Sequence, residues 1–346
     1  MLPFPGTEHW HYLHGKPKSS ATLKAIPEHF KVNEVLPFEP VGEGEHLFLQ
    51  IEKTGLNTGF VAQQLARFYG VKERDVGYAG RKDKHAVTTQ WFSVWLPGVK
   101  SAPVKQFVYD GCNIKQQSWH SKKIRTGNLS HNEFQITLTD LEKDTDLEER
   151  IAKVKHTGVP NYFGPQRFGN INSDGVAGNL AMARLLINNE TIKKREKRNM
   201  AVSALRSWLF NEAVSERLTK LSTTPENGDV FSLAGSNSFF VAETIDSEIL
   251  TRLAGADIHL SAPLWGAGKP ASLGVPGELE NSLAERFPEI CNTLAALGLK
   301  QERRKLLLYP KDFSYQLHEQ QLLLNFSLPS GCFATSVIRE LLCLNP

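Results

Sequence analysis

The sequence predicts an α+β protein in which a two-part core is interrupted by a helix-rich insertion. Strand-like runs of β-branched and aromatic residues open the chain, as in FKVNEVLPF at residues 30–38 and EHLFLQIEKTG at residues 45–55. From about residue 159 helical patterns dominate, and near residue 303 an order of strands followed by a helix returns. The 346 residues are enough for two ordinary domains or for one domain with a large insertion.

The elements of the first half follow from periodicity and from residues that begin and end helices. Residues 58–70, TGFVAQQLARFYG, predict a helix with Thr58 as its N-cap and Gly70 at its end. A glycine-containing turn then leads into the next segments. The patterns predict a strand at 86–96, a pair of strands at 122–128 and 132–141, and a helix at 144–158.

The later elements are predicted in the same way. The segment NYFGPQRFGNINSDG, residues 161–175, lacks periodicity and predicts a structured loop, and helices are expected at 176–189 and 199–221. The second helix has a stripe that we expect to be buried, made of Leu205, Leu209, Ala213 and Leu218. The Gly- and Pro-rich residues 261–280 predict a loop, and residues 303–346 predict strands and then a helix.

Composition limits the class of protein. A net charge of only +3 produces no global field, so any preference for nucleic acid must come from local clusters of charge. The four cysteines form no CxxC pair, which is typical of free thiols in a reducing compartment. Residues 1–20 lack the apolar core of a secretory signal, and no apolar run approaches the ~18 residues of a membrane span. We therefore expect a soluble cytoplasmic protein.

Motifs for cofactors and metals are weak. GAGK at residues 266–269 is similar to a phosphate-binding loop, but Pro263 and Pro270 stand where that loop needs glycine and Ser or Thr. A spacing of i, i+2, i+5 near the N-terminus is more typical of chance than of a metal site, for the trio His9, His11 and His14. We expect no cofactor and no metal.

Basic clusters with neighbouring aromatic residues favour RNA modestly. The clusters are KKREKR at residues 193–198, Lys122 with Lys123 and Arg125, and Lys153 with Lys155. The aromatic residues, which we expect to be exposed, are Tyr162, Phe163 and Phe168 beside Arg167. Each cluster alone is more typical of a solvated face. Together they indicate a surface that holds phosphates and stacks bases.

One carboxylate lies among cations in GYAGRKDKHAVTTQWFSV, residues 77–94. Asp83 has Arg81, Lys82 and Lys84 as neighbours, and these cations favour its ionised form. An ionised carboxylate suits a nucleophile or a base, and it does not suit a general acid. The alternative is a turn residue in a surface salt bridge worth under ~1 kcal/mol. The residues alone leave both interpretations open.

The motif that contains Asp83 resembles the signature of the tRNA pseudouridine synthase D family, called TruD. The matching positions run Ala79-Gly80-x-Lys82-Asp83-x-His85-Ala86-Val87-Thr88-x-Gln90. Further blocks resemble the family in order along the chain: LKAIPEHFKVNEVLPF, GEGEHLFLQIEKTGLNT, KIRTGNLSHNEFQI, VPNYFGPQRFG, SALRSWLFNEAVSERL and LPSGCFATSVIREL. The resemblance covers nearly the whole chain.

The resemblance implies roles for particular residues. Asp83 matches the nucleophilic aspartate of pseudouridine synthases, and Lys24 matches a basic residue near that carboxylate. Phe134 matches the aromatic residue expected to stack on the target base. The remaining positions of the uridine pocket are Phe30, Asn132 and Phe333.

One residue departs from the family pattern. His131 stands where the family usually has glycine, and a positive φ there would strain the loop.

The resemblance also implies a fold and a reaction. The fold is a pseudouridine synthase core, residues 1–158 and 306–346, with a mixed, largely antiparallel sheet flanked by helices. An α/β TRUD domain is inserted at residues 159–305, and a basic cleft between the two parts is expected to hold tRNA. The implied reaction isomerises a uridine of tRNA, usually position 13, without cofactor or metal. We expect a monomer that needs no partner besides tRNA.

Several points of mechanism stay open at this stage. Asp83 has three possible roles: attack on the base, attack on the sugar, or removal of a ribose proton. We expect Lys82 and Lys84 to point toward phosphate, because neighbouring residues on an extended chain face away from Asp83. Two rival functions are a non-catalytic RNA-binding protein or folding chaperone, and a nucleoside or glycoside hydrolase. The hydrolase would need a second carboxylate, and no second acid lies in a comparable motif.

Overall fold

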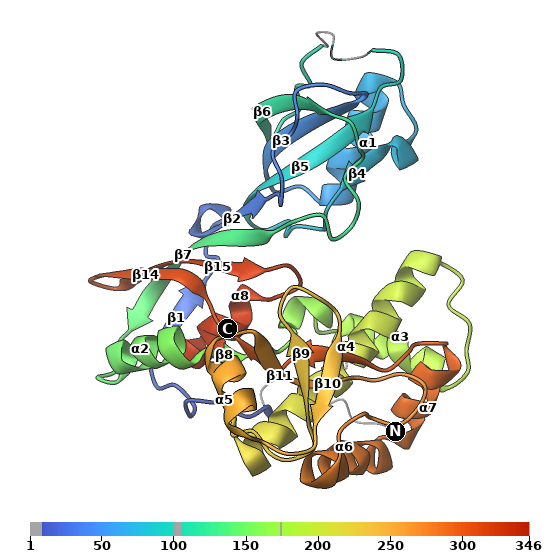
Figure 1. The fold of residues 1–346 in the computed structure, drawn as a ribbon. Helices are drawn as coiled ribbons and strands as arrows, with labels where there is room; N and C mark the ends of the chain where they lie inside the picture. The colour runs from blue at the N-terminus through green and yellow to red at the C-terminus, as the bar shows by residue number, and fades with distance from the viewer. Residues whose placement is uncertain (1–8, 100, 102–104, 174, 346) are drawn as a thin grey trace. The chain divides into compact units, whose positions relative to one another are not determined.

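The computed structural model describes residues 9–99, 101, 105–173 and 175–345, so residues 1–8 of the segment discussed as a possible signal lie outside it. The chain divides into two compact units, whose helices and strands are labelled in Figure 1 where there is room. The large-sheet unit contains Pro17–Glu149, Pro310–Gly331 and Leu342–Pro346, as far as they are described. The small-sheet unit contains the described part of Met1–Lys16 together with Arg150–Tyr309 and Cys332–Leu341.

The large-sheet unit is built on a ten-stranded sheet, whose main path has the order β14-β15-β7-β2-β5-β3-β6. β1 pairs with β7 and with β16, and β4 pairs with β5. The β2–β5 and β1–β16 pairs are parallel, and the others are antiparallel, so the predicted mixed, largely antiparallel sheet is confirmed. The strands are β1 (Ser20–Leu23), β2 (Phe30–Val35), β3 (His46–Thr54), β4 (Val76–Tyr78), β5 (Val87–Trp95), β6 (Cys112–His120), β7 (His131–Glu142), β14 (Lys311–His318), β15 (Gln321–Pro329) and β16 (Cys343–Leu344).

Helix α1 (Thr58–Tyr69) lies beside β4 and β5. Its apolar side, which includes Val61 and Leu65, belongs to the same buried cluster as Leu47, Leu49 and Ile51 of β3. The prediction of Thr58 as N-cap is wrong, because the N-cap is Asn57 and Thr58 is the first helical residue, whose hydroxyl bonds Gln90 and Lys82 instead. The helix ends at the predicted Gly70, whose φ of 69° is the left-handed conformation that favours glycine. Helix α2 (Leu147–Thr157) also follows the prediction.

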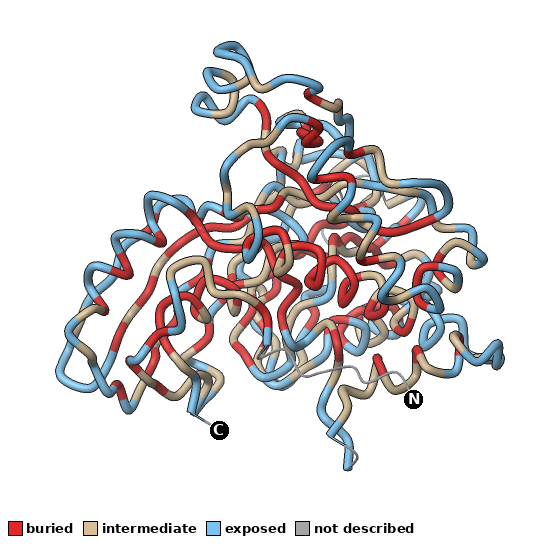
Figure 2. The backbone as a smooth tube through the Cα atoms, turned by 90° about the horizontal axis from the view of Figure 1, so that it is seen from below, coloured by how far each residue is buried: buried red, intermediate tan, exposed pale blue. Residues whose placement is uncertain are grey.

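The two faces of the sheet differ in character. Along β2, Phe30, Val32 and Glu34 are buried, while Lys31 is exposed and Asn33 is half-buried. The antiparallel register with β7 places Glu34 opposite Asn132 and Val32 opposite Phe134. Successive side chains of a strand alternate between faces, so these residues share one face of the sheet. Figure 2 colours the backbone by how far each residue is buried, with buried residues in red and exposed residues in pale blue.

The small-sheet unit combines a four-stranded antiparallel sheet of order β10-β9-β11-β12 with several helices. Its long helix α4 buries the predicted stripe of Leu205, Leu209, Ala213 and Leu218. Among the described residues the strands are β8 (Val159–Pro160), β9 (Asp229–Leu233), β10 (Phe239–Ala242), β11 (Ile258–Leu264), β12 (Glu302–Lys305) and β13 (Leu307–Leu308). The helices are α3 (Gly178–Ile187), α4 (Arg195–Leu221), α5 (Ser247–Ala254), α6 (Gly274–Arg286), α7 (Pro288–Ala296) and α8 (Ala334–Leu341).

The predicted strand at residues 122–128 is wrong. The strand before β7 is β6, and residues 122–128 form a connecting loop. Ile124 is buried and its backbone N–H donates to Ser93 Oγ at 3.0 Å, while Arg125 N–H donates to Asn128 Oδ1 at 2.8 Å. Side-chain oxygens thus accept the backbone hydrogen bonds that a neighbouring strand would accept in a sheet. Gly77 permits this approach, because a Cβ there would overlap the Ile124 carbonyl.

The predicted loop at residues 261–280 is also wrong at both ends. Ser261–Leu264 belong to β11, where Pro263 lies opposite Arg303. Helix α6 begins at Gly274, and Pro276 lies in its first turn, where a backbone N–H has no partner within the helix. Glycine and proline therefore marked the boundaries of these elements rather than their absence.

The two compact units follow a different division from the predicted insertion. Residues 332–341, assigned above to the core, pack with Arg150–Tyr309, whereas 310–331 pack with 17–149. Compactness does not decide which segment is inserted, so the boundaries at 159 and 305 stay a prediction. Over the described residues, no helix is both long enough and apolar enough to cross a bilayer.

Candidate active site

The loop that carries Asp83 connects β4 to β5 and is fixed at three backbone positions. Gln90 Nε2 donates to the Gly80 carbonyl at 3.2 Å, and the Lys82 N–H donates to Thr58 Oγ1 at 2.9 Å. Lys53 Nζ donates to the Asp83 carbonyl at 3.0 Å. The Thr58 hydroxyl in turn donates to Gln90 Oε1 at 2.7 Å, which joins helix α1, strand β5 and the loop in one network. Asp83 is therefore displayed by a rigid loop.

The Asp83 carboxylate is bound on both oxygens. Lys24 Nζ forms an ion pair with Oδ2, and the His85 N–H donates to Oδ1 at 3.2 Å. The Lys24 ammonium group also lies 4.0 Å from the centroid of the Phe30 ring, a cation–π arrangement. Lys24 adopts a φ of 61°, which a lysine rarely takes. The structure thus brings three predicted residues, Lys24, Phe30 and Asp83, into one cluster.

Lys53 is a buried cation beneath this loop. Its side chain is 0% exposed, and Nζ donates to the carbonyl oxygens of Leu56, at 2.7 Å, and Asp83. Burial lowers the pKa of Lys53 from 10.5 to about 8, and the nearby Asp83 carboxylate opposes this effect. The side chain ties the turn before α1 to the backbone of Asp83.

The prediction that Lys82 points toward phosphate is wrong. Its ammonium group lies 2.8 Å from Glu34 Oε2 and also donates to Asn132 Oδ1. The Lys82 side chain is 9% exposed and that of Glu34 is 0% exposed, so this is a buried ion pair. An unpaired buried Glu34 would be costly, which explains why Lys82 turns inward. Lys84 is exposed, and its predicted orientation stays a prediction.

Phe134 lies on the same face of the sheet as Asn132. Its ring meets Phe30 edge-on at 6.1 Å and stacks on Phe326 at 5.5 Å. Phe134 is 9% exposed, so the ring is part of an aromatic cluster that borders the Lys24 ammonium through Phe30. Its stacking on a base stays a prediction.

Phe333 belongs to the small-sheet unit, where it precedes helix α8. Its ring lies 5.8 Å from that of Phe163, and the Arg167 guanidinium lies over both rings at 5.6 and 5.2 Å. The Arg304 guanidinium lies 4.2 Å from the Phe163 ring. These contacts place Phe333 in a cluster of aromatic rings and guanidinium groups. Its membership of the uridine pocket stays a prediction.

The expectation of exposed aromatic residues near 161–175 is wrong. Tyr162, Phe163 and Phe168 are 2%, 7% and 1% exposed. Trp10 stacks on Tyr162 at 5.6 Å and meets Phe168 at 5.7 Å, so a segment far away in sequence covers them. The predicted basic clusters do lie at the surface in part: residues 193–198 are all exposed, as are Lys153 and Lys155.

His131 does not strain the backbone. It lies in β7, paired with Val35 of β2 and Pro329 of β15, and extended backbone of this kind suits any residue. The departure from the family glycine therefore leaves the position of Asn132 intact.

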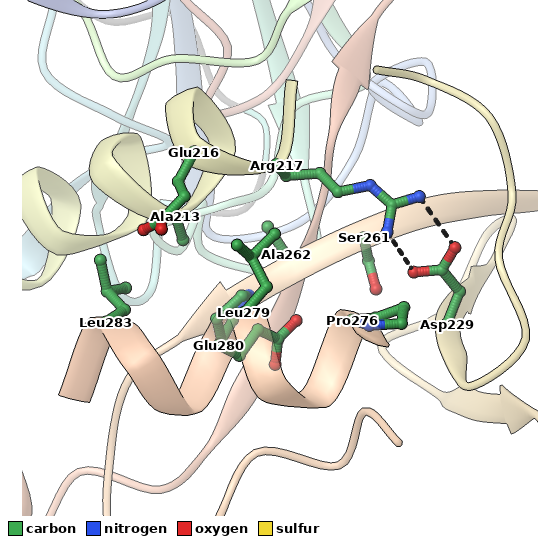
Figure 3. A pocket seen from close by; sticks show the side chains of 11 residues that line it. Ala213, Glu216, Arg217, Asp229, Ser261, Ala262, Pro276, Leu279, Glu280 and Leu283 are labelled. Atoms are coloured by element: carbon green, nitrogen blue, oxygen red, sulfur yellow. Dashed lines mark hydrogen bonds and ion pairs between the residues drawn. The ribbon is translucent and has the colours of Figure 1, made fainter. Parts of the chain in front are cut away.

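Asp83 lines neither of two cavities in the structure. A hollow of about 470 Å³ is lined by Lys31, Asn33 and Gln135 and also by Phe134, a predicted residue of the uridine pocket. Figure 3 shows a cavity of about 20 Å³ in the small-sheet unit, closed by the bidentate pair of Arg217 and Asp229 at 2.8 and 2.9 Å. That volume holds about one water molecule. Within the described residues, no three His, Cys, Asp or Glu side chains are grouped to hold a metal ion.

The sequence did not predict two residues of the site, Glu34 and Lys53. A signal for Glu34 was present, because the alternation of β2 places it on the buried face with Phe30 and Val32. An acid at such a position indicates a buried partner. For Lys53 the alternation of β3 gives the same signal.

Comparison with known proteins identifies the family. The chain matches the family described as tRNA pseudouridine synthase D (TruD) over residues 7–183 and 190–341, which include every predicted site residue. A relative with that name from Pseudoalteromonas atlantica is 48% identical over 335 residues, covering 96% of both chains. Another from Shewanella oneidensis is 46% identical over 331 residues, covering 96% of this chain and 88% of the relative.

A solved structure agrees in fold. The crystal structure of a TruD protein from Methanosarcina mazei superposes with a TM-score of 0.72 at 20% identity, covering 96% of this chain and 95% of that one. The fold and these matches place the protein among the pseudouridine synthases. The chain belongs to the TruD family.

Proposed function

We propose that the protein isomerises a uridine of tRNA to pseudouridine, with Asp83 as the reacting carboxylate. One observation carries the assignment to Asp83: the carboxylate in the family motif is the one that a fixed loop presents to Lys24, whose ammonium group lies over the Phe30 ring. Relatives that are 48% and 46% identical carry the name of this activity.

The reaction rearranges bonds without changing composition. The N-glycosidic bond of the uridine breaks, the uracil turns, and a carbon of the ring rejoins the ribose. The displaced proton of that carbon is balanced by a proton gained at the nitrogen. Asp83 acts as the carboxylate nucleophile or base of this sequence. Lys24 keeps the carboxylate oriented, and the three backbone anchors hold the loop while the base turns.

The base must leave its stack to reach Asp83, at a cost of a few kcal/mol. We assign the pocket that receives it to Phe30, Phe134 and Asn132, which share one face of the sheet. A contact of Phe333 with the base stays a prediction from the family resemblance. The aromatic rings would offset part of the lost stacking. Residues 193–198, exposed at the start of α4, would contact phosphates. We further propose that residues 159–305 form the inserted TRUD domain, that no cofactor takes part, and that the protein acts as a monomer on cytoplasmic tRNA.

A direct assay tests the proposal. The purified protein is incubated with an unmodified tRNA transcript without metal or nucleotide, and pseudouridine is mapped by carbodiimide treatment and primer extension. The proposal expects one new stop, at the uridine of position 13. A transcript with cytidine at that position is the matched control and should give none.

Two other outcomes would replace the proposal. Binding of tRNA without any new stop would favour a non-catalytic RNA-binding protein or chaperone. Release of free uracil would favour a hydrolase. Light scattering of the protein with and without tRNA tests the monomer.

A further inference from the structure

The buried ion pair of Lys82 and Glu34 lies directly against Asn132. Glu34 faces Asn132 across the β2–β7 register, and its Oε1 accepts a bond from the Trp91 backbone N–H at 3.1 Å. Its Oε2 holds the Lys82 ammonium group at 2.8 Å. That ammonium group also contacts Asn132 Oδ1. Glu34 is anchored, so it fixes where the charge of Lys82 lies.

This contact decides which way the amide of Asn132 faces. An ammonium group has three donors and no acceptor, so only the amide oxygen can meet it. The Nδ2 group must then point away from Lys82. Among the described residues, Asn132 Nδ2 donates no hydrogen bond, and it is not one of the buried polar atoms left without a partner. Asn132 therefore presents a donor to whatever approaches this face of the sheet.

A fixed donor distinguishes two pyrimidines. At the position where uracil carries the acceptor O4, cytosine carries an amino group, which is a donor. A donor that is held in place binds O4 of uracil and is repelled by the amino group of cytosine. An amide free to rotate would accommodate both, because it would turn its oxygen toward the amino group.

We propose that Lys82 is a specificity-determining residue, which holds the amide of Asn132 so that the pocket selects uracil over cytosine. The inference rests on the proposed function in one respect, since it takes Asn132 to lie against the target base. Lys82 acts through Asn132 and is a positioning residue. A merely structural ion pair would change stability and leave base selection unchanged.

The test measures selection by binding, separately from catalysis. Two tRNA transcripts differ only in uridine or cytidine at position 13, and the dissociation constant of each is measured by fluorescence anisotropy. The parent is the Asp83→Asn variant, which is not expected to consume the uridine transcript. We expect its dissociation constant to be on the order of 10- to 100-fold lower for the uridine transcript. This ratio corresponds to the cost of leaving one buried polar group without a hydrogen-bond partner.

Three variants in this background separate the explanations. Lys82→Met should bring the ratio of the two dissociation constants to less than about 3-fold, because the amide can rotate. Glu34→Met/Lys82→Met should do the same without leaving a buried carboxylate unpaired. Asn132→Asp should reverse the preference, because one carboxylate oxygen meets Lys82 and the other accepts from the cytosine amino group. Circular dichroism melting verifies that each variant is folded.

Lys84→Met is the matched control, because Lys84 is the exposed neighbour on the other side of Asp83. This variant should bind both transcripts more weakly by the same factor and leave the ratio of the two dissociation constants unchanged. A parent that binds both transcripts equally, or a folded double variant that keeps the full preference, overturns the inference. If the ratio moves as expected while the unmodified protein forms no pseudouridine, the proposed function fails and the inference about base selection stands.

Discussion

Lys24 pairs with the carboxylate of Asp83 while its ammonium group lies 4.0 Å from the centre of the Phe30 ring. The two charged side chains are 17% and 18% exposed, so the pair is largely shielded from water. An ion pair in such a setting is stronger than one at the surface, and loss of one partner leaves the other poorly solvated. Asp83 is thus contacted by a cation that is distant in sequence.

Removing the charge of Lys24 should slow the chemical step more than it weakens RNA binding. For Lys24→Met we expect kcat to fall at least about 10-fold and KM for tRNA to change less than about 3-fold, since the ammonium group orients Asp83. Single-turnover kinetics on a tRNA transcript measure both. Lys115→Met removes a more exposed lysine paired with Glu52 in the same unit and should change neither. A Lys24 variant with full kcat would contradict the role given to this pair.

Lys53 should make the stability of the protein depend on pH. Its pKa is about 8 in the folded protein and 10.5 ordinarily, so the unfolded chain binds more protons between these values. Stability contributed by this group therefore rises as pH increases from 8 to 10.5, by about 3 kcal/mol in total. Urea unfolding of the unmodified protein and of Lys53→Met at pH 7 and pH 10 measures it. Between pH 7 and pH 10 the free energy of unfolding of the unmodified protein should increase relative to that of the variant. An equal difference between the two proteins at both pH values would rule the effect out.

Thr88 offers a stabilising substitution beside the site. It is 0% exposed, and its Oγ1 is buried without a hydrogen-bond partner in the described part of the chain. Thr88→Val has the same shape and removes the unsatisfied hydroxyl, so the free energy of unfolding should increase by about 1 kcal/mol. Urea unfolding measures the change. A loss of stability would show that the hydroxyl has a partner.

The basic run at the start of α4 should contribute to the salt dependence of tRNA binding. If its side chains contact phosphates, replacing Lys193, Lys194, Arg195, Lys197 and Arg198 with Ala should make the plot of log affinity against log salt shallower by about 0.7 to 0.9 per contact. Lys220→Ala, near the other end of the same helix, is the control. An unchanged slope would show that residues 193–198 are an ordinary solvated surface that does not contact phosphates.

The fold was predictable where the pattern is local. The strand-like run at residues 30–38 and the helix at residues 58–70 depend on neighbours in sequence, and strand β2 and helix α1 lie within these ranges. Residues 122–128 did not follow the prediction, because Ile124 is held by Ser93, a contact that local periodicity does not contain. Trp10 buries Tyr162 in the same way across 152 positions.

The cluster of Lys24, Phe30 and Asp83 was predictable from the sequence, and the orientation of Lys82 was not. The motif around Asp83 and the match of Lys24 name the two partners of the ion pair. The direction of Lys82 depends on Glu34, which lies on strand β2. Charge pairing between the β4–β5 loop and strand β2 decided it, and the loop sequence alone holds no signal of that partner.

The central claim is that Asp83 carries out the reaction, and replacement of its carboxylate by an isosteric amide tests it most directly. Asp83→Asn keeps the backbone carbonyl that Lys53 binds, so the loop anchor remains. The measurement is single-turnover formation of pseudouridine in a tRNA transcript, by carbodiimide mapping, with the folding of the variant verified by its melting curve. The account predicts that tRNA is still bound and no pseudouridine forms. Product formed by the folded variant at the rate of the unmodified protein would contradict it.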